Sequence, residues 1–260
     1  MASFDIMDRF EIHKNEKFLK IADECIPPLK EQDIKAALLE GDAAEMGKGD
    51  SAVFDLGDHY VGYISLRLGY TGSHPDAPLF IKVRFAERLR EFEDDPDEYD
   101  GWISRSWIQE EWIHVDVLPF ELKLARRYAC RYIRVEVIDT SQKYKASIEE
   151  VAFKAVSAVS MEDITLPDCK APKLNEIVRA SAYTLKECMQ QVFEDGPKRD
   201  RRLWLGDLRL QAGVNYITFK RTDLVKRCLY LFAGLPFNDD RISACLFTEP
   251  ECESDDTFLF

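Results

Sequence analysis

Three aspartates within a short segment are the side chains whose types and spacing could do chemistry. Asp195, Asp200 and Asp207 are separated by five and seven residues; Arg199 precedes the second, and Trp204 lies between the second and the third. Carboxylates can hydrogen-bond sugar hydroxyls or donate a proton, a guanidinium group can orient them, and an indole can cover the apolar face of a sugar. This pattern is compatible with a sugar site. Composition alone favours the alternative, a charged interhelical loop held by Asp–Arg pairs with Trp204 as its core anchor.

Two helical patterns flank this segment and must position it. Apolar residues recur at helical spacing from Pro172 to about Val192, which predicts an amphipathic helix of about five turns with proline in its first turn. A second helical pattern runs from roughly Asp207 to Ala233, where Gly234 begins a suitable stop.

Upstream of the helices, the hydrophobic period is two. From Ser51 to about Val156, apolar and polar residues alternate in about seven short segments, as in residues 79–85. This spacing predicts an antiparallel, jelly-roll-like β-sandwich. Strands followed by helices indicate two domains rather than one α/β fold. The expected organisation is an irregular lead-in at 1–50, a β-sandwich at 51–158, a linker at 159–171 and a helical domain at 172–260.

The net charge and the apolar runs of the chain indicate which classes of partner to expect. The chain has 35 Lys and Arg against 48 Asp and Glu, a formal charge of −13. Such a surface repels phosphate backbones and anionic lipid, so we expect neither nucleic acid nor a membrane as partner. No apolar run reaches the roughly 18 residues of a membrane span, and the first residues lack the apolar core of a signal peptide.

The cysteines and histidines show no metal-site spacing. Seven cysteines are scattered without a CxxC pair, which is typical of buried thiols in a reducing compartment and predicts a cytoplasmic protein. The four histidines form neither HxxxH nor HExxH. No phosphate-binding or dinucleotide-binding motif occurs, so we expect no metal and no cofactor.

The segment from Asp195 to Asp207 resembles the opening of the catalytic domain in the α-L-rhamnosidases of glycoside hydrolase family 78. Those enzymes carry D-C-P-x-R-[ED]-[KR]-x-x-W-x-G-D after the first barrel helix. Three further stretches are similar to the family: SAYTLKECMQQVFED before the motif, FNDDRISACLFTEP after it, and GDSAVFDLGDHYVGYISLRL in the sandwich. The resemblance covers most of residues 47–260. The matching motif positions are Asp195, Pro197, Arg199, Asp200, Trp204, Gly206 and Asp207.

The resemblance implies an inverting hydrolase that releases terminal α-L-rhamnosyl, or related deoxyhexosyl, residues from a rhamnose-containing glycoside. It implies a β-sandwich followed by an (α/α)6 barrel. Asp200 matches the general acid, Asp195 and Asp207 match carboxylates that bind sugar hydroxyls, and Arg199 and Trp204 match residues that line the same pocket. The chain departs from the motif in two places: the acid is usually Glu rather than Asp, and Gly196 replaces the common Cys.

Length sets a further expectation. Inversion needs a second carboxylate as base, roughly 6.5–9.5 Å from the acid, and the family's base lies far downstream. A barrel of twelve helices needs about 200 residues, whereas only about 90 follow Pro172. We therefore expect an N-terminal portion that lacks the base and, assayed alone, hydrolyses rhamnosides negligibly. An incomplete barrel should also leave apolar side chains without partners, namely Ile177, Leu185, Leu224 and Leu231.

Two other functions remain open. In a non-catalytic carbohydrate-binding protein, the sandwich would do the binding, with Trp102, Trp107 and Trp112 at five-residue steps as a stacking platform. Packing of these rings in the core or between domains is the favoured interpretation of the same spacing. Alternatively, the incomplete barrel would bind a protein partner through an exposed apolar face. The sequence makes no prediction of oligomeric state.

Overall fold

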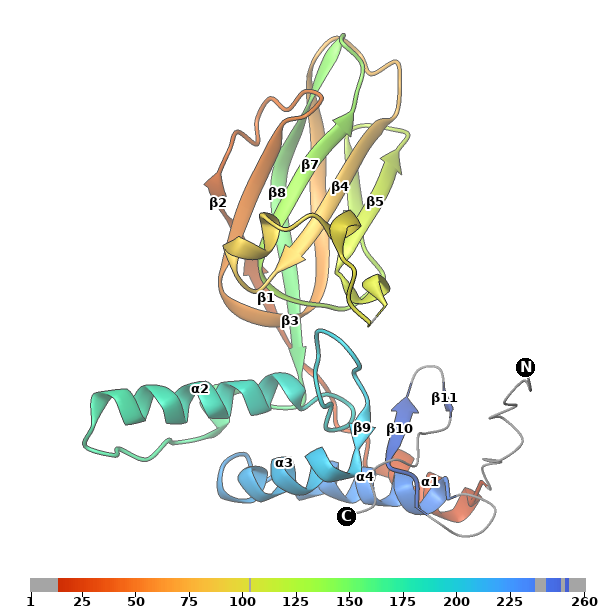
Figure 1. The fold of residues 1–260 in the computed structure, drawn as a ribbon, viewed down its shortest axis with the longest axis vertical. Helices are drawn as coiled ribbons and strands as arrows, with labels where there is room; N and C mark the ends of the chain where they lie inside the picture. The colour runs from red at the N-terminus through yellow and green to blue at the C-terminus, as the bar shows by residue number, and fades with distance from the viewer. Residues whose placement is uncertain (1–13, 103, 237–241, 249–250, 253–260) are drawn as a thin grey trace. The chain divides into compact units, whose positions relative to one another are not determined.

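The computed structural model describes residues 14–102, 104–236, 242–248 and 251–252, which fall into two compact units (Figure 1). The sandwich unit is Glu31–Val156. The helical unit combines Met1–Lys30 with Ser157–Phe260. Each unit has its own hydrophobic core, so each is described by itself.

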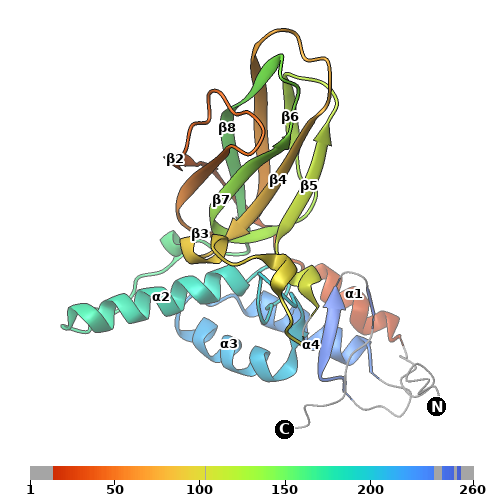
Figure 2. The same ribbon diagram turned by 45° about the horizontal axis from the view of Figure 1, so that its top comes forward.

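The sandwich unit is built from antiparallel strands in the order β1-β8-β3-β7-β4-β5, with β2 and β6 also paired to β3 (Figure 2). Short 3-10 helices interrupt the acidic loop between β4 and β5: η2 Leu89–Phe92, η3 Pro96–Glu98 and η4 Arg105–Trp107. The strands are β1 Lys30–Lys35, β2 Ala37–Glu40, β3 Ser51–Gly72, β4 Leu79–Ala86, β5 Glu110–Val115, β6 Phe120–Lys123, β7 Tyr128–Asp139 and β8 Tyr144–Ser157.

The long strand β3 belongs to both layers of the sandwich. Its first part pairs with β2 and β7, and its last part pairs with β8 and β6. The register with β7 shifts between Asp55 and Tyr60, where Gly57 has a φ of 87° that favours glycine. This irregularity bends the strand, and the two layers therefore close around one core.

The alternating pattern divides buried from outward-facing residues. Leu79, Ile81 and Val83 of β4 are at most 1% exposed, while Lys82 and Arg84 face outward and form ion pairs. Burial of one apolar face per strand is the main stabilising contribution here. The predicted antiparallel sandwich is confirmed.

The predicted irregular lead-in is wrong for the described part of residues 1–50. Helix α1 occupies Glu16–Glu24, and β1 and β2 follow. The helix ends before Pro27, where the sequence predicts a break. Strands β1 and β2 were missed because nearly all their residues are exposed, so they lack the alternation that burial of one face imposes.

The helical unit contains α1, η5 Met161–Asp163, α2 Pro172–Cys188, α3 Leu205–Ile217 and α4 Thr222–Gly234. It also has a small antiparallel sheet of β9 Leu203–Trp204, β10 Cys245–Thr248 and β11 Glu251–Cys252. Helices α1 and α4 pack closely: the Asn15 amide donates to the Gly234 carbonyl at 2.8 Å, and a Cβ on Gly234 would lie 2.7 Å from Leu19 Cδ2.

The second helical pattern was predicted as one helix and is two. The break is at residues 218–221, which contain neither glycine nor proline. The side chain of Asn215 replaces the missing helical bonds: its Oδ1 accepts from the Arg221 amide at 3.0 Å and its Nδ2 donates to the Arg221 carbonyl at 3.2 Å. Asn215 is fully buried, so this bracing depends on tertiary packing.

Four apolar side chains were expected to lack packing partners in an incomplete barrel, and only one of them is exposed. Leu185 and Leu224 are buried in the helical core, and Leu231 packs against it, whereas Ile177 is 60% exposed. The predicted order, a sheet-rich domain followed by helices α2 to α4, is confirmed, although α1 precedes the strands. Among the described residues, no helix is both long and apolar enough to cross a membrane.

Candidate active site

The end of α2 and the turn after it position Asp195. The helix stops at Met189, which forms an antiparallel bridge with Phe193, and the Glu194 amide donates to the Cys188 carbonyl at 2.8 Å. Met189 and Phe193 are fully buried in the helical core. This anchored turn brings the chain to Asp195 in one defined direction.

Asp195 and Arg202 close the loop between them at its neck. The Asp195 amide donates to the Arg202 carbonyl at 3.0 Å, and Asp195 Oδ1 accepts from the Arg202 amide at 3.0 Å. Within the loop, Arg201 has a φ of 56°; its amide donates to the Gly196 carbonyl and its Nε to the Pro197 carbonyl at 2.9 Å. The residues between Asp195 and Arg202 therefore form a compact loop.

Arg199 and Asp200 lie at the tip of this loop. Arg199 Nε is 3.7 Å from Asp200 Oδ1, and the side chain of Asp200 is 22% exposed against 49% for Arg199. The carboxyl group is thus accessible to a ligand while a guanidinium group lies beside it. This is one of the Asp–Arg pairs on which the charged-loop alternative rested.

Trp204 and Asp207 are placed by the small sheet and by α3. Trp204 pairs with Cys245 of β10, and the Leu205 amide donates to the Ala244 carbonyl at 2.9 Å. Trp204 then serves as the N-cap residue of α3, and it is half-buried. Asp207 is exposed in the first turn of that helix, where the helix dipole favours a negative charge.

The three motif carboxylates are electrostatically coupled. Burial raises the pKa of Asp195, hydrogen bonds from the Arg202 and Gly196 amides oppose this, and the charges of Asp200 and Asp207 raise the pKa further. A charge acts this way only over a short range in a partly buried site. Asp200 and Asp207 therefore both lie close enough to Asp195 to influence its charge.

A buried polar cluster beneath the motif was not predicted. Lys186 Nζ is 2.7 Å from Glu187 Oε1, and Gln211 donates to the Glu194 carbonyl at 2.7 Å. Lys186, Glu187 and Glu194 are each less than 9% exposed. Burial is the main cause that raises the pKa of the Cys188 thiol to about 12, and the charges of nearby carboxylates raise it further. The sequence signal was the run of polar residues at the end of an amphipathic helix, where an apolar stripe should continue.

Arg202 has a second role that its sequence position does not indicate. Its guanidinium carbon lies 3.8 Å from the centre of the Phe247 ring on β10. The neck of the loop is therefore attached to a strand more than 40 residues downstream. Part of the downstream stretch that resembled the family, Phe237–Pro250, lies outside the described residues, including 237–241 and 249–250.

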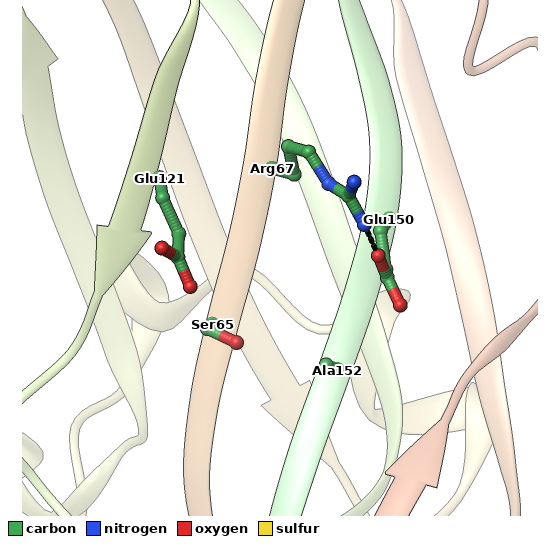
Figure 3. A pocket seen from close by; sticks show the side chains of 5 residues that line it. All are labelled: Ser65, Arg67, Glu121, Glu150 and Ala152. Carbon is green, nitrogen blue, oxygen red and sulfur yellow. Dashed lines mark ion pairs between the residues drawn. The ribbon is translucent and has the colours of Figure 1, made fainter.

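A hollow of about 390 Å³ lies on the sandwich unit and does not involve the motif (Figure 3). Arg67 of β3 points toward Glu150 of β8 and forms an ion pair with it; Glu121 of β6 is 3.2 Å from Lys123. Ser65 of β3 and Ala152 of β8 complete the lining. Its charges are already paired, so we assign it no role. Among the described residues, no group of three His, Cys, Asp or Glu side chains is arranged to hold a metal ion.

Two family models match this chain, one over the sandwich and one over the helices that follow it. Residues 29–155 match the family model of the glycosyl hydrolase family 78 alpha-rhamnosidase N-terminal domain. Residues 163–239 match the model of the bacterial alpha-L-rhamnosidase 6 hairpin glycosidase domain. Together the two models span most of the chain. The chain belongs to glycoside hydrolase family 78.

Solved structures of this family show the same fold. A rhamnosidase from Klebsiella oxytoca with rhamnose bound is 41% identical, with a TM-score of 0.89 over 95% of this chain and 52% of that one. The family 78 chain therefore spans about half the length of that relative. It is an antiparallel β-sandwich followed by the first helices of the helical barrel domain, as predicted.

More distant family 78 structures agree in fold. A rhamnosidase of Bacillus sp. GL1 is 22% identical, with a TM-score of 0.56 over 75% of this chain and 18% of that one. An alpha-L-rhamnosidase from Dictyoglumus thermophilum is 18% identical, with a TM-score of 0.57 over 84% of this chain and 23% of that one. Among curated protein sequences, none matches this chain.

Proposed function

We propose that this chain contributes the general acid and part of the sugar pocket of an inverting hydrolase. The reaction is removal of terminal α-L-rhamnosyl, or related deoxyhexosyl, residues from glycosides. The observation that carries the proposal is the loop that Asp195 and Arg202 close, which places the Asp200 carboxyl group 3.7 Å from Arg199 Nε. The rhamnose bound in the Klebsiella relative supports the choice of sugar.

Each motif residue has a distinct proposed role. Asp200, accessible at the loop tip, protonates the glycosidic oxygen as the bond to the leaving group breaks. Asp195 and Asp207 accept hydrogen bonds from sugar hydroxyls and thereby orient the ring. Arg199 lies beside the acid and Trp204 presents its indole to the apolar face of the sugar.

The domain limits and the cellular location also belong to this proposal. The expected sandwich limits of 51–158 are replaced by those of the sandwich unit, Glu31–Val156, while the linker is proposed to span 159–171 and the barrel portion 172–260. No disulfide joins the cysteines among the described residues, and Cys188 and Cys228 are buried thiols, which supports a cytoplasmic location.

The general base is proposed to lie outside these 260 residues. The chain spans 52% of the Klebsiella structure, so about half of that relative has no counterpart in this chain. Assayed alone with 4-nitrophenyl α-L-rhamnoside, the 260-residue chain should therefore turn over negligibly. Turnover at a typical enzymatic rate of roughly 1–10³ s⁻¹ would place the base within these residues.

The role of Asp200 as the acid is tested in the protein encoded by the reading frame extended beyond Phe260. Where the frame does not continue, the remainder of the barrel is expressed separately and added to this chain. Asp200→Asn should lower kcat/KM about 10²–10⁴-fold for a rhamnoside with a poor alcohol leaving group. The nitrophenyl rhamnoside should be affected far less because its leaving group needs little protonation. Glu176→Gln, an exposed acid on α2, is the matched control and should leave both rates unchanged. Equal losses for the two substrates would exclude Asp200 as the acid.

A further inference from the structure

An aromatic row lies on the outward face of the sandwich unit, on β4 and the edge strand β5. It consists of Trp112, Phe80 and His114. Phe80 is paired across the strands with His114, and Lys82 with Trp112. The rings of Phe80 and His114 are stacked, with centroids 4.0 Å apart and planes 5° apart, and the Phe80 ring is 5.7 Å from Trp112. Three rings from two adjacent strands thus form one continuous surface.

The row is accessible and its tryptophan ring is held in place. Trp112 is 52% exposed, although it belongs to a strand whose last residue, Val115, is buried. Lys82 Nζ lies 4.9 Å from the indole centroid, and Trp112 Nε1 donates to Glu110 Oε1 at 2.7 Å. These contacts orient the ring, and much of its surface still faces solvent. An exposed but ordered indole loses little conformational entropy when a ligand stacks on it.

The charged groups around the row balance one another. Lys82 is 3.4 Å from Glu136 on β7, and Glu110 is 3.5 Å from Arg84. The surface therefore combines apolar ring faces with hydrogen-bonding groups and has no excess charge among these four residues. This combination suits an uncharged ligand that has an apolar face and polar edges, which describes a pyranose ring.

We infer that the aromatic row binds a neutral oligosaccharide. A pyranose ring stacks on Trp112 and a second sugar unit extends over Phe80 and His114. The inference uses only the sandwich unit and does not depend on the proposed hydrolase function.

The residues inferred to bind sugar in the sandwich unit therefore differ from those expected from the sequence. The stacking platform expected at five-residue steps is distributed over three elements: Trp102 lies in a loop, Trp107 in η4 and Trp112 in β5. The partners of Trp112 are instead a phenylalanine and a histidine. By contrast, the five residues that line the hollow of Figure 3 include no aromatic ring.

The test is an NMR titration of the ¹⁵N-labelled 260-residue chain, following the indole N–H signals. The probes are cellohexaose, xylohexaose, mannohexaose and methyl α-L-rhamnoside, with hexagalacturonate as the charged counterpart. At least one neutral oligosaccharide should shift the Trp112 signal saturably. Trp112→Ala should weaken that binding at least about tenfold, and Phe80→Leu should weaken it less.

Trp102→Ala is the matched control, because Trp102 is 95% exposed and lies outside the row. It should leave the affinity unchanged, and circular dichroism should show that Trp112→Ala still folds. Trp112→Leu, which keeps an apolar side chain, should also lose binding if the ring face is what the sugar contacts.

Three results would overturn the inference. One is the absence of any Trp112 shift with all neutral probes. Another is preferential binding of hexagalacturonate. The third is a change in sedimentation mass of the unliganded chain on Trp112→Ala, which would make the row a contact between copies. Failure of the hydrolase proposal would appear instead in the rhamnoside assays, which do not involve Trp112.

Discussion

Asp195 and the Arg202 main chain are joined by two hydrogen bonds, each 3.0 Å long: the Asp195 amide donates to the Arg202 carbonyl, and the Arg202 amide donates to Asp195 Oδ1. One Asp195 oxygen is thus used to close the loop that bears Asp200. The same carboxyl group is destabilised in its charged form by burial and by two neighbouring carboxylates. Asp195 therefore shapes the candidate site and also makes the fold sensitive to pH.

Replacing Asp195 by Asn should stabilise the chain at neutral pH. The raised pKa means that the folded state binds a proton more tightly than the unfolded state, so the charged form costs stability above the folded-state pKa. This cost disappears as the pH falls below the unfolded value of about 4. Asn keeps the acceptor for the Arg202 amide. The melting temperature of Asp195→Asn should exceed that of the unmodified chain at pH 7 and match it near pH 3.5; a lower value at pH 7 would contradict this.

Leu224→Ala should destabilise the helical unit by about 2–5 kcal/mol because the side chain is fully buried and its removal leaves a cavity. Leu210→Ala is the control: Leu210 is 72% exposed, and its loss should change stability by no more than about 0.5 kcal/mol. Urea unfolding measured by circular dichroism distinguishes them. Similar effects for the two variants would mean that the helical core is not packed as described.

The thiols of Cys188 and Cys228 should resist alkylation in the folded chain. Burial is the main cause that raises the pKa of each to about 12, so at pH 8.5 roughly three in ten thousand are thiolates. Cys25 and Cys169 are partly exposed and should react with iodoacetamide. Peptide mass spectrometry gives the order of labelling, and all four should react in guanidinium chloride. Labelling of folded Cys188 as fast as Cys169 would disprove its burial.

Arg131→Gln should lower stability modestly in the sandwich unit. Arg131 holds Asp55 through two bonds, Nε to Oδ1 at 2.9 Å and Nη2 to Oδ2 at 3.0 Å, and this lowers the pKa of Asp55. Because the Arg131 side chain is 39% exposed, solvent screening limits the loss to less than about 1 kcal/mol.

The same pair has a pH signature. A lowered folded-state pKa contributes stability above the unfolded value of about 3.9 that is lost as the pH falls through the folded value. The difference in melting temperature between Arg131→Gln and the unmodified chain should therefore shrink from pH 7 to pH 3. A constant difference would show that the ion pair is not its source.

Local patterns predicted the parts of the fold in which burial repeats along the chain. The alternation in β4 and the helical spacing of α2 were both readable because one face of each element is buried. Strands β1 and β2 have almost no buried residues and gave no such signal. The break between α3 and α4 was missed because a buried side chain, Asn215, stabilises it in place of glycine or proline.

The candidate site was likewise predicted only in part from the sequence. The motif from Asp195 to Asp207 was recognised from residue types and spacing, as was the family that the comparisons identify. Spacing did not indicate that Asp195 closes the loop or that Arg202 contacts Phe247. Nor did it distinguish Trp112 from Trp102, because the exposure of a ring depends on what packs against it.

By itself, the sequence determined the strands and helices in which one face is buried, their order and the family motif, because these follow from local periodicity and residue identity. Tertiary structure alone decided that the charges of Asp200 and Asp207 act on Asp195, and that a tryptophan, a phenylalanine and a histidine form one surface. The physical reason is that charge coupling, desolvation and ring stacking depend on distances through space. Only the packing of α2, α3 and the β9–β10 pair, or the pairing of β4 with β5, brings those groups together.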